Sequence, residues 1–363
     1  MKKILTIVGT RPNIIKITRF GQEYQKYMHL EYRLLHTGQH YSQNMSDVFF
    51  DELQLKQPDF VLKTDTTTVV AQLVHIMQGI EQAIHTYKPD LMVVVGDVNS
   101  TLAAALVANK MGIPLAHLES GLRSSDRSMP EEINRILTDA ITDIFFVTEQ
   151  SGVENLTKEG KSQDQIYLVG NTMIDTLVAY DEPIKASDIL QKLQVKPDTY
   201  ALMTMHRPGN VDTEEGLLKI IEVIAFLTRQ TRIVFPIHPR TLNKLKEYNL
   251  LNKLTGNKNL ILMEPAGYLD FQHLILHARF VITDSGGIQE ETTFRQIPCI
   301  TLRPNTERPS TVEIGSNTLL NFDTEKIQST VEKIFSNAYK HCAVPPLWDG
   351  KATERIFEVI SKL

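Results

Sequence analysis

The chain has 363 residues, of which 42% are hydrophobic and 22% charged, as in a water-soluble globular protein. Its formal net charge of −5 gives no overall attraction to nucleic acid or to anionic membranes, so neither is expected as a partner. The two cysteines, Cys299 and Cys342, have no CxxC spacing, and no apolar run approaches the about 18 residues of a membrane span. We therefore expect no zinc site, no other metal and a cytoplasmic location.

Short apolar runs alternate with helical periodicity in two arrays along the chain. Because the runs are continuously apolar, they predict parallel strands covered on both faces, and their alternation with helices predicts a doubly wound α/β fold. A chain of this length exceeds one ordinary core. We expect two Rossmann-like domains facing across a cleft, with a connecting segment over 176–198. The clearest predicted strands lie at 3–8, 91–95, 144–148 and 165–170, then at 200–205, 232–238, 260–264, 279–284 and 299–303, and helices are predicted over 12–28, near 43–53 and over 101–111.

The loop V-G-T-R-P-N-I-I-K over 8–16 follows the first predicted strand. Gly9 allows a tight turn, and the following helix N-terminus could bind a phosphate group together with Arg11. Lys16 lies one turn further along. The alternative is an ordinary turn with surface cations, and the absence of GxGxxG argues against a dinucleotide site.

A second glycine-containing loop, I-T-D-S-G-G-I-Q-E-E-T-T, spans 282–293. Backbone N–H groups of Ser285, Gly286 and Gly287 could cradle a pyrophosphate, and Glu290 or Glu291 could accept hydrogen bonds from ribose hydroxyls. The alternative is a glycine turn followed by a solvated helix face. The combination favours nucleotide binding.

Acidic residues gather after the predicted strands of the first array. Asp97 follows the most apolar strand, where burial can shift a carboxyl pKa, although an Asp capping the next helix explains it as well. Glu119 follows PLAHL and should be drawn into the cleft. Glu131 begins a helix after Pro130, and its i, i+4 spacing to Arg135 predicts a surface salt bridge.

Basic residues follow the strands of the second array. His206 and Arg207 come directly after the strand at 200–205 and are candidates for acid–base work and phosphate binding. His238 and Arg308 occupy similar positions. Carboxylates in one domain, a histidine in the other and two phosphate cradles together predict proton transfer on a nucleotide-linked substrate.

Several segments in one order carry a resemblance to a known family: GTRPNIIK, GDVNST, HLESGLRS with PEEINR, MHR, DSGGIQEE and NTERP. Together they resemble the non-hydrolysing UDP-N-acetylglucosamine 2-epimerases, and DGKATERI at 349–356 is similar to that family's C-terminal signature. The resemblance implies a glycosyltransferase-B architecture, with domains at 1–175 and 176–349 and a last helix at 350–363 that packs back on the first. It also implies a homodimer that needs no cofactor and binds a UDP-amino sugar.

The family's mechanism eliminates UDP to leave a bound 2-acetamidoglucal and then re-adds UDP with the C2 proton on the other face. By this resemblance Asp97, Glu119 and Glu131 would be the acid–base carboxylates, and His206 would handle the diphosphate or a proton. The resemblance also assigns binding roles: Arg11, Ser285 and Gly286 would hold the diphosphate, Glu291 the ribose, Phe271 would lie near uracil, and Lys16 would be a supporting cation.

Two departures from the family's pattern concern regulation. Members that are activated by UDP-N-acetylglucosamine resemble QHR and HRRE, whereas this chain has QHY at 39–41 and HRPG at 206–209. Since each change removes an arginine, weak or absent activation is expected. A hydrolysing 2-epimerase, a 2-epimerase of another UDP-amino sugar, a glycosyltransferase and a non-catalytic nucleotide-sugar sensor remain as alternatives.

Overall fold

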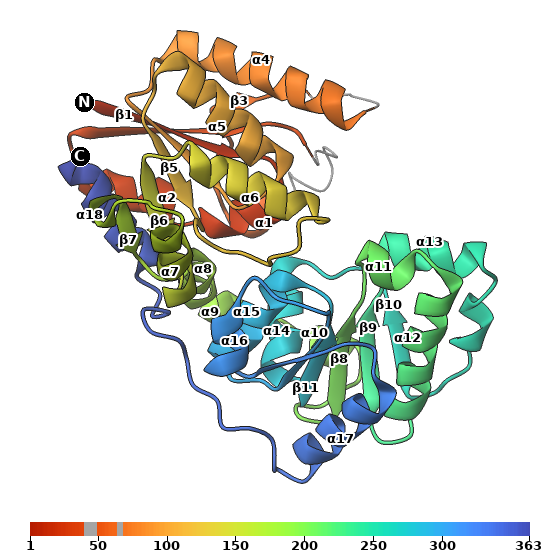
Figure 1. Cartoon of the computed structure of the whole chain (residues 1–363). Coiled ribbons are helices and arrows are strands. Elements are labelled where there is room, and N and C mark those ends of the chain that lie inside the picture. The colour runs from red at the N-terminus through yellow and green to blue at the C-terminus, as the bar shows by residue number, and fades with distance from the viewer. Residues whose placement is uncertain (40–48, 64–67) are drawn as a thin grey trace. The chain divides into compact units, whose positions relative to one another are not determined.

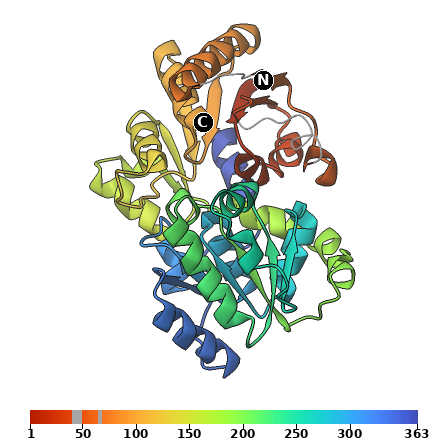
Figure 2. The same ribbon diagram turned by 90° about the vertical axis from the view of Figure 1, so that its right-hand side faces the viewer.

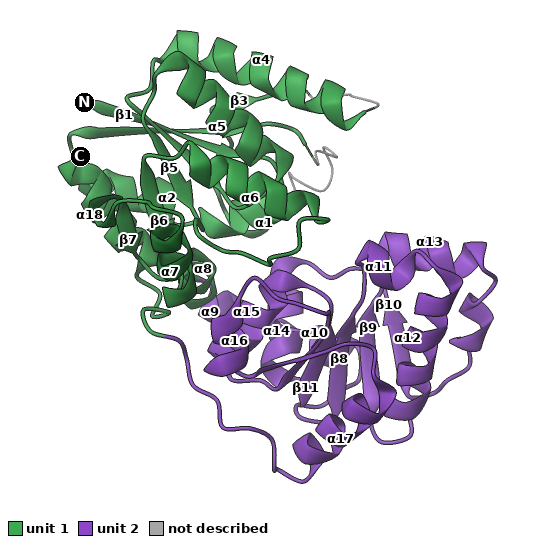
Figure 3. Cartoon of the chain, in the orientation of Figure 1, with its two compact units in different colours: residues 1–179, 346–363 green, residues 180–345 purple. Residues whose placement is uncertain are grey.

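The computed structural model describes residues 1–39, 49–63 and 68–363, and the chain forms two compact units (Figures 1 and 3). Unit 1 consists of residues 1–179 and 346–363, and unit 2 of residues 180–345. The sequence placed the first boundary after residue 175, within what is helix α8 (Thr172–Ala179) of unit 1. Each unit has its own parallel sheet and its own helices.

Unit 1 contains a seven-stranded sheet in the order β3-β2-β1-β4-β5-β6-β7. All of its neighbouring strands pair in parallel. The order runs outward from β1 to β3 and then reverses at β4, as in a Rossmann sheet. The strands are β1 (Lys2–Val8), β2 (Leu30–His36), β3 (Phe60–Val61), β4 (Leu91–Val95), β5 (Leu115–Leu118), β6 (Ile144–Val147) and β7 (Ile166–Leu168).

Helices cover both faces of this sheet because successive side chains of a strand point to opposite sides. Leu5 and Ile7 of β1 pack under α4 and α5, where they meet Ile76 and Ile80. On the opposite face α1 packs against α8, and α18 against α2 and α8. The other helices of unit 1 are α1 (Arg11–Lys16), α2 (Phe20–Glu23), α4 (Val69–Tyr87), α5 (Asn99–Met111), α6 (Pro130–Ala140), α7 (Gln150–Lys158) and α18 (Ala352–Lys362).

The helix predicted over 12–28 is interrupted between α1 and α2. The hydroxyl of Thr176 in α8 donates to the carbonyl of Ile15 at 2.5 Å and lies 2.6 Å from the hydroxyl of Thr18. A carbonyl that would continue the helical ladder is therefore engaged by a side chain from another helix. The predicted helix near 43–53 falls largely on residues outside the described ranges.

The C-terminal segment returns to unit 1, where the two ends of the chain lie near each other (Figure 2). The carboxylate of Asp175 accepts from the first N–H groups of α18, those of Ala352 and Thr353, at 3.0 and 2.6 Å. The ring of Phe357 in α18 packs edge-on against Phe20, with centroids 5.2 Å apart. This helix therefore completes the core of the first unit.

Unit 2 repeats the same strand order with six parallel strands, β10-β9-β8-β11-β12-β13. Helices α12, α13 and α17 pack on one face of the sheet, and α10, α14 and α15 on the other (Figure 1). The connecting segment predicted over 176–198 contains two short helices, α9 (Asp181–Lys185) and α10 (Ile189–Lys192). The strands are β8 (Tyr200–Thr204), β9 (Arg232–Pro236), β10 (Leu260–Met263), β11 (Phe280–Thr283), β12 (Cys299–Leu302) and β13 (Asn317–Leu320), and the other helices are α11 (Pro208–Val211), α12 (Glu214–Leu227), α13 (Pro239–Glu247), α14 (Tyr268–His277), α15 (Gly286–Arg295), α16 (Pro309–Glu313) and α17 (Thr324–Phe335).

Within the described ranges, the structure contains no helix that combines the length and the apolar character needed to cross a bilayer. The same part of the chain contains no group of three or more His, Cys, Asp or Glu side chains placed to hold a metal ion.

Candidate active site

The strand order reverses beside the first strand of each unit, between β1 and β4 and between β8 and β11. In doubly wound sheets, ligands bind beyond the carboxyl ends of the strands at such a reversal. Four of the predicted residues follow these strands directly: Arg11 after β1, Asp97 after β4, His206 after β8 and Ser285 after β11. The sequence motifs therefore lie at the carboxyl edge of each sheet beside the reversal, which we call the binding edge for its place in the fold.

Lys16 and Glu119 form a buried ion pair at this edge of unit 1. Nζ of Lys16, at the end of α1, donates to Oε2 of Glu119, directly after β5. Their side chains are only 7% and 3% exposed. A Cβ placed on Gly96, after β4, would lie 3.4 Å from both charged atoms. The alternative interpretation of this loop, an ordinary turn with surface cations, is therefore wrong for Lys16. The ion pair joins segments that follow β1, β4 and β5.

The backbone of Glu119 is in the left-handed region, with φ of +69°. This conformation costs a non-glycine residue about 1–2 kcal/mol. It is held by the neighbouring strand, because the N–H groups of Glu119 and Ser120 lie 3.0 and 3.3 Å from the carbonyl of Phe146 in β6. Strain of this kind gathers at functional sites, where the surrounding structure fixes it.

Asp97 forms an ion pair with Arg135, for which the helical spacing predicted Glu131 as the partner. Nη1 of Arg135 donates to Oδ2 of Asp97 at 2.5 Å, and Nη2 donates to Oε2 of Glu132 at 2.8 Å. The predicted surface salt bridge between Glu131 and Arg135 is wrong, since Arg135 is buried and turned toward these two carboxylates. The capping alternative for Asp97 is also wrong, because Val98 is the N-cap of α5. Glu131 is partly exposed at the start of α6.

Glu132, which the sequence reading did not single out, holds the loop after β5. Its carboxylate accepts from the N–H groups of Ser124 and Ser125 at 2.9 and 3.0 Å and from the Ser124 hydroxyl at 3.1 Å. Burial acts to raise the pKa of Glu132, but the hydrogen bonds from Ser124 and Arg135 outweigh it and lower the pKa. Part of the charge between 117 and 135 is thus structural.

The loop after β1 is organised by Asn13. Its Oδ1 accepts from the N–H groups of Gly9 and Thr10, both at 3.2 Å, and its amide donates to the carbonyl of Val95 at 3.1 Å. These two N–H groups are therefore already engaged, and α1 is only six residues long. Arg11 is exposed, with its guanidinium 4.9 Å from the ring centroid of Phe49.

Asp284 organises the binding edge of unit 2. It lies in the motif at 282–293 but was not among the predicted site residues. This fully buried carboxylate accepts from the N–H groups of His206 and Arg207 at 3.0 and 2.9 Å and from the amide of Asn210 at 3.0 Å. It also lies 3.0 Å from Nδ1 of His206. Burial acts to raise the pKa of Asp284, but its contacts with His206 and Arg207 lower it overall. The ionised carboxylate fixes the ring, so that Nε2 of His206 is the nitrogen left for a ligand.

His238 lies beside His206, with ring centroids 5.4 Å apart. Its Nδ1 accepts from the N–H of Arg240 at 3.1 Å, as the N-cap of α13. Burial and the neighbouring His206 lower the pKa of His238. The structure therefore brings together the predicted residues His206 and His238. Because Nδ1 of His238 accepts the capping hydrogen bond, the ring is neutral and carries its hydrogen on Nε2.

The predicted cradle of N–H groups lies at the start of α15. The N–H of Ser285 donates to the hydroxyl of Thr283 at 3.0 Å, so it is already engaged. Gly286 and Gly287 form the first turn of the helix, where N–H groups have no intrahelical acceptor. A Cβ on Gly286 would lie 2.9 Å from Nη1 of Arg308, which leaves no room for a side chain.

The two glutamates of α15 are both buried, so the alternative of a solvated helix face is wrong. Oε1 of Glu290 lies 2.9 Å from Nε of Arg308, whose Nη1 also donates to Glu307. Phe271 lies on α14, partly buried against the core beneath that helix.

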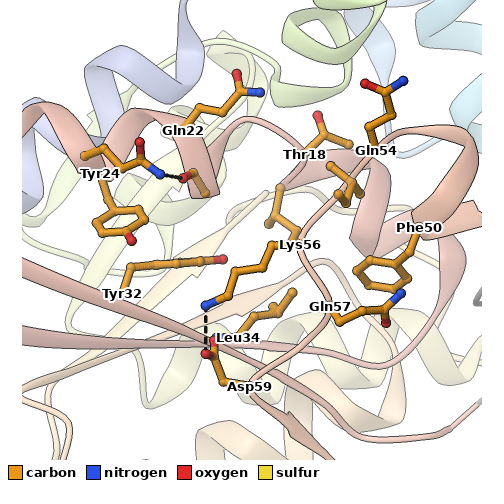
Figure 4. A pocket seen from close by; sticks show the side chains of 14 residues that line it. Thr18, Gln22, Tyr24, Tyr32, Leu34, Phe50, Gln54, Lys56, Gln57 and Asp59 are labelled. Carbon is orange, nitrogen blue, oxygen red and sulfur yellow. Dashed lines mark hydrogen bonds and ion pairs between the residues drawn. The ribbon is translucent and has the colours of Figure 1, made fainter.

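A cavity of about 240 Å³ lies elsewhere in unit 1 and contains none of the predicted residues (Figure 4). Tyr24 and Tyr32, with stacked rings 5.4 Å apart, line it together with Phe50. Its two charged residues, Lys56 and Asp59, pair with each other at 3.0 Å. It lies over the middle of β2 and not at the strand ends, so it is separate from the candidate active site.

Comparison with known proteins agrees with this geometry. Residues 22–361 match the family described as UDP-N-acetylglucosamine 2-epimerase. The chain belongs to this family. It is 41% identical to UDP-N-acetylglucosamine 2-epimerase of Methanocaldococcus jannaschii, with 99% of each chain covered. It is also 34% identical to UDP-2,3-diacetamido-2,3-dideoxy-D-glucuronate 2-epimerase of Pseudomonas aeruginosa, over 99% of this chain and 100% of that one.

The chain also shares its fold with a solved epimerase structure. The structure of the Methanocaldococcus jannaschii enzyme in complex with UDP-N-acetylglucosamine and UDP matches it with a TM-score of 0.91, covering 99% of this chain and 100% of that one at 41% identity. The predicted α/β fold of the glycosyltransferase-B type, the predicted family and the predicted enzyme class, an isomerase, are confirmed.

Proposed function

We propose that the enzyme interconverts UDP-N-acetylglucosamine and UDP-N-acetylmannosamine by eliminating and re-adding UDP. The observation that carries the proposal is the full-length likeness, at 41% identity, to an epimerase whose solved structure contains UDP-N-acetylglucosamine and UDP. The buried charges at the binding edges of both sheets support it, because they suit a substrate that must lose a proton and a diphosphate.

In the elimination, a carboxylate takes the proton from C2, the C1–O bond breaks, and UDP leaves with the electron pair of that bond. A bound 2-acetamidoglucal with a C1–C2 double bond remains. In the return step UDP attacks C1 and a proton reaches C2 from the other face, so acid–base groups must reach both faces. Asp97, Glu119 and Glu131 would supply these groups, and Lys16 would hold the carboxylate of Glu119 in place through their ion pair.

The residues of unit 2 would hold UDP. Arg207, Arg308, Ser285 and the N–H groups of Gly286 and Gly287 would bind the diphosphate, since cations and helix N-termini stabilise leaving phosphates. Arg11, which the resemblance also assigns to the diphosphate, belongs to unit 1. Nε2 of His206, oriented by Asp284, would donate to the leaving diphosphate, with His238 beside it. Glu291 would accept from the ribose hydroxyls, and Phe271 would lie near uracil.

Proton NMR of UDP-N-acetylglucosamine with the enzyme in deuterium oxide tests the proposal. We expect a mixture of gluco and manno UDP-sugars with deuterium at C2. Asp97→Asn should abolish this exchange but keep UDP binding. A non-catalytic sensor or a glycosyltransferase would instead show no deuterium exchange at C2 even without the substitution. Free N-acetylmannosamine and UDP as products would place the enzyme with the hydrolysing 2-epimerases instead.

A second candidate substrate is another UDP-amino sugar, such as a 6-deoxy or 3-acetamido sugar. The observation that favours it is the 34% identity to an epimerase of a UDP-2,3-diacetamido sugar acid. If UDP-N-acetylglucosamine gives no deuterium at C2 while such an analogue does, this second function is the correct one.

We further infer that activation by UDP-N-acetylglucosamine is weak or absent. In HRPG, Pro208 and Gly209 begin the short helix α11, so no cation extends from these positions. The other departure, QHY, includes His40 and Tyr41, which lie outside the described residues. Initial rates with UDP-N-acetylmannosamine alone should be hyperbolic, and strongly sigmoidal rates would contradict this. The homodimer expected from the resemblance is tested by light scattering in solution.

A further inference from the structure

A buried histidine–carboxylate pair lies beneath the three proposed catalytic carboxylates. His117 is the third residue of β5, and Asp139 lies near the end of α6; both side chains are 0% exposed. Nδ1 of His117 lies 2.7 Å from Oδ1 of Asp139, and Nε2 lies 2.8 Å from the carbonyl oxygen of Gly96. Two buried titratable groups are thus placed against the loop that carries Asp97.

The direction of each hydrogen bond follows from its partner. A carbonyl oxygen can only accept, so Nε2 of His117 donates to Gly96. The other oxygen of Asp139 accepts from the N–H of Gly121 at 3.0 Å and lies 2.8 Å from Nη2 of Arg123. Burial acts to raise the pKa of Asp139, but the contacts with His117 and Arg123 lower it. Nδ1 faces Oδ1 of Asp139, so both ring nitrogens of His117 are held by fixed partners on two different elements.

This pair connects every element that carries a proposed catalytic carboxylate. It holds the Gly96 carbonyl in the loop of Asp97, and through Gly121 and Arg123 it holds the loop that begins with Glu119. Asp139 itself is on the helix whose first turn contains Glu131. Because the Gly96–Asp97 peptide is trans, fixing its carbonyl also fixes the opposite direction of the Asp97 N–H.

We propose that His117 and Asp139 are positioning residues that set the relative placement of Asp97, Glu119 and Glu131. The proposal rests on the proposed function of those three carboxylates. His117 touches no substrate; it acts by holding the loop after β4 in the one orientation from which Asp97 reaches C2. Displacing a reacting group by about 1 Å lowers a rate about 100-fold.

The test compares His117→Gln, Asp139→Asn and the double variant with the unchanged enzyme, using the deuterium-exchange assay. We expect kcat to fall about 100-fold in each, with KM changed less than about threefold, because distant contacts bind the substrate. Since the two residues act as one unit, the double variant should lose little more than the worse single variant. Unchanged kcat, or losses that multiply in the double variant, would overturn the proposal.

A control and a second measurement separate positioning from general damage. Thr142→Val removes a buried hydroxyl that donates to the Thr138 carbonyl at 2.8 Å at the end of α6, and it should leave kcat and KM unchanged. Nitrogen-15 NMR of the unchanged enzyme should show hydrogen on Nε2 of His117, the nitrogen that donates to the Gly96 carbonyl, and a bare Nε2 would also overturn the proposal. If the unchanged enzyme exchanges C2 of no UDP-amino sugar, the proposed function fails instead, while the NMR result still stands.

Discussion

Breaking the buried pair of Lys16 and Glu119 should destabilise unit 1 far more than breaking an exposed pair. With side chains 7% and 3% exposed, neither charge can be hydrated when its partner is removed. Lys16→Met and Glu119→Gln should therefore each cost about 3–5 kcal/mol of unfolding free energy. The double substitution leaves no uncompensated charge, so its cost should be lower than the sum of the two by at least about 2 kcal/mol.

The single tryptophan of the chain makes this measurement specific for unit 1. Trp348 is 2% exposed, and its indole N–H donates to the Thr148 carbonyl at 3.1 Å, so its fluorescence in urea follows this unit alone. Lys56→Met is the matched control, since its pair with Asp59 is 77% and 21% exposed and should contribute less than about 1 kcal/mol. Single costs as small as the control's, or additive costs, would refute the reasoning.

Three further predictions concern other sites. Burial lowers the pKa of His36 to about 4, so the unfolded chain binds more protons below pH 6.5 and stability should fall by about 3 kcal/mol from pH 6.5 to 4. His36→Gln should flatten that fall in urea titrations at several pH values. Asp284→Asn should destabilise unit 2 by about 3 kcal/mol in urea followed by circular dichroism and should lower kcat, because His206 loses a charged acceptor. Gly121→Ala should cost about 3 kcal/mol by Trp348 fluorescence, because φ is +78° and the new Cβ would lie 2.4 Å from the Gly152 carbonyl oxygen.

The strands were predictable because their signal is local. Continuous apolar runs such as LMVVV mark strands buried on both faces, and β4 spans the predicted 91–95. The glycine loops and acids do follow the carboxyl ends of the strands, and parallel strands bring those ends to one side of the sheet. The break between α1 and α2 was not predictable, because the hydroxyl that engages the Ile15 carbonyl there belongs to Thr176, far along the chain.

The side-chain partners were the least predictable part of the site. Spacing along a helix predicted that Arg135 pairs with Glu131, yet a buried arginine instead binds Asp97, 38 residues away, as well as Glu132. Lys16 and Glu119 are 103 residues apart. Such pairings depend on which strands become neighbours, which periodicity does not encode. Asp284 could have been predicted as a site residue from the sequence. A carboxylate between a buried strand and a glycine pair has little access to solvent and therefore needs hydrogen-bond partners in the protein.

The return of residues 346–363 to unit 1 has a consequence for how the chain is made. Ribosomes add about 5–20 residues per second. The 166 residues of unit 2, 180–345, therefore take roughly 8–33 s to synthesise before α18 can follow. During that time the aromatic surface of Phe20 and Tyr32, which Phe357 covers in the finished protein, has no cover from α18. Synthesis of unit 1 therefore begins first and ends last. Its incomplete form, which lacks α18, is the one that a chaperone would bind.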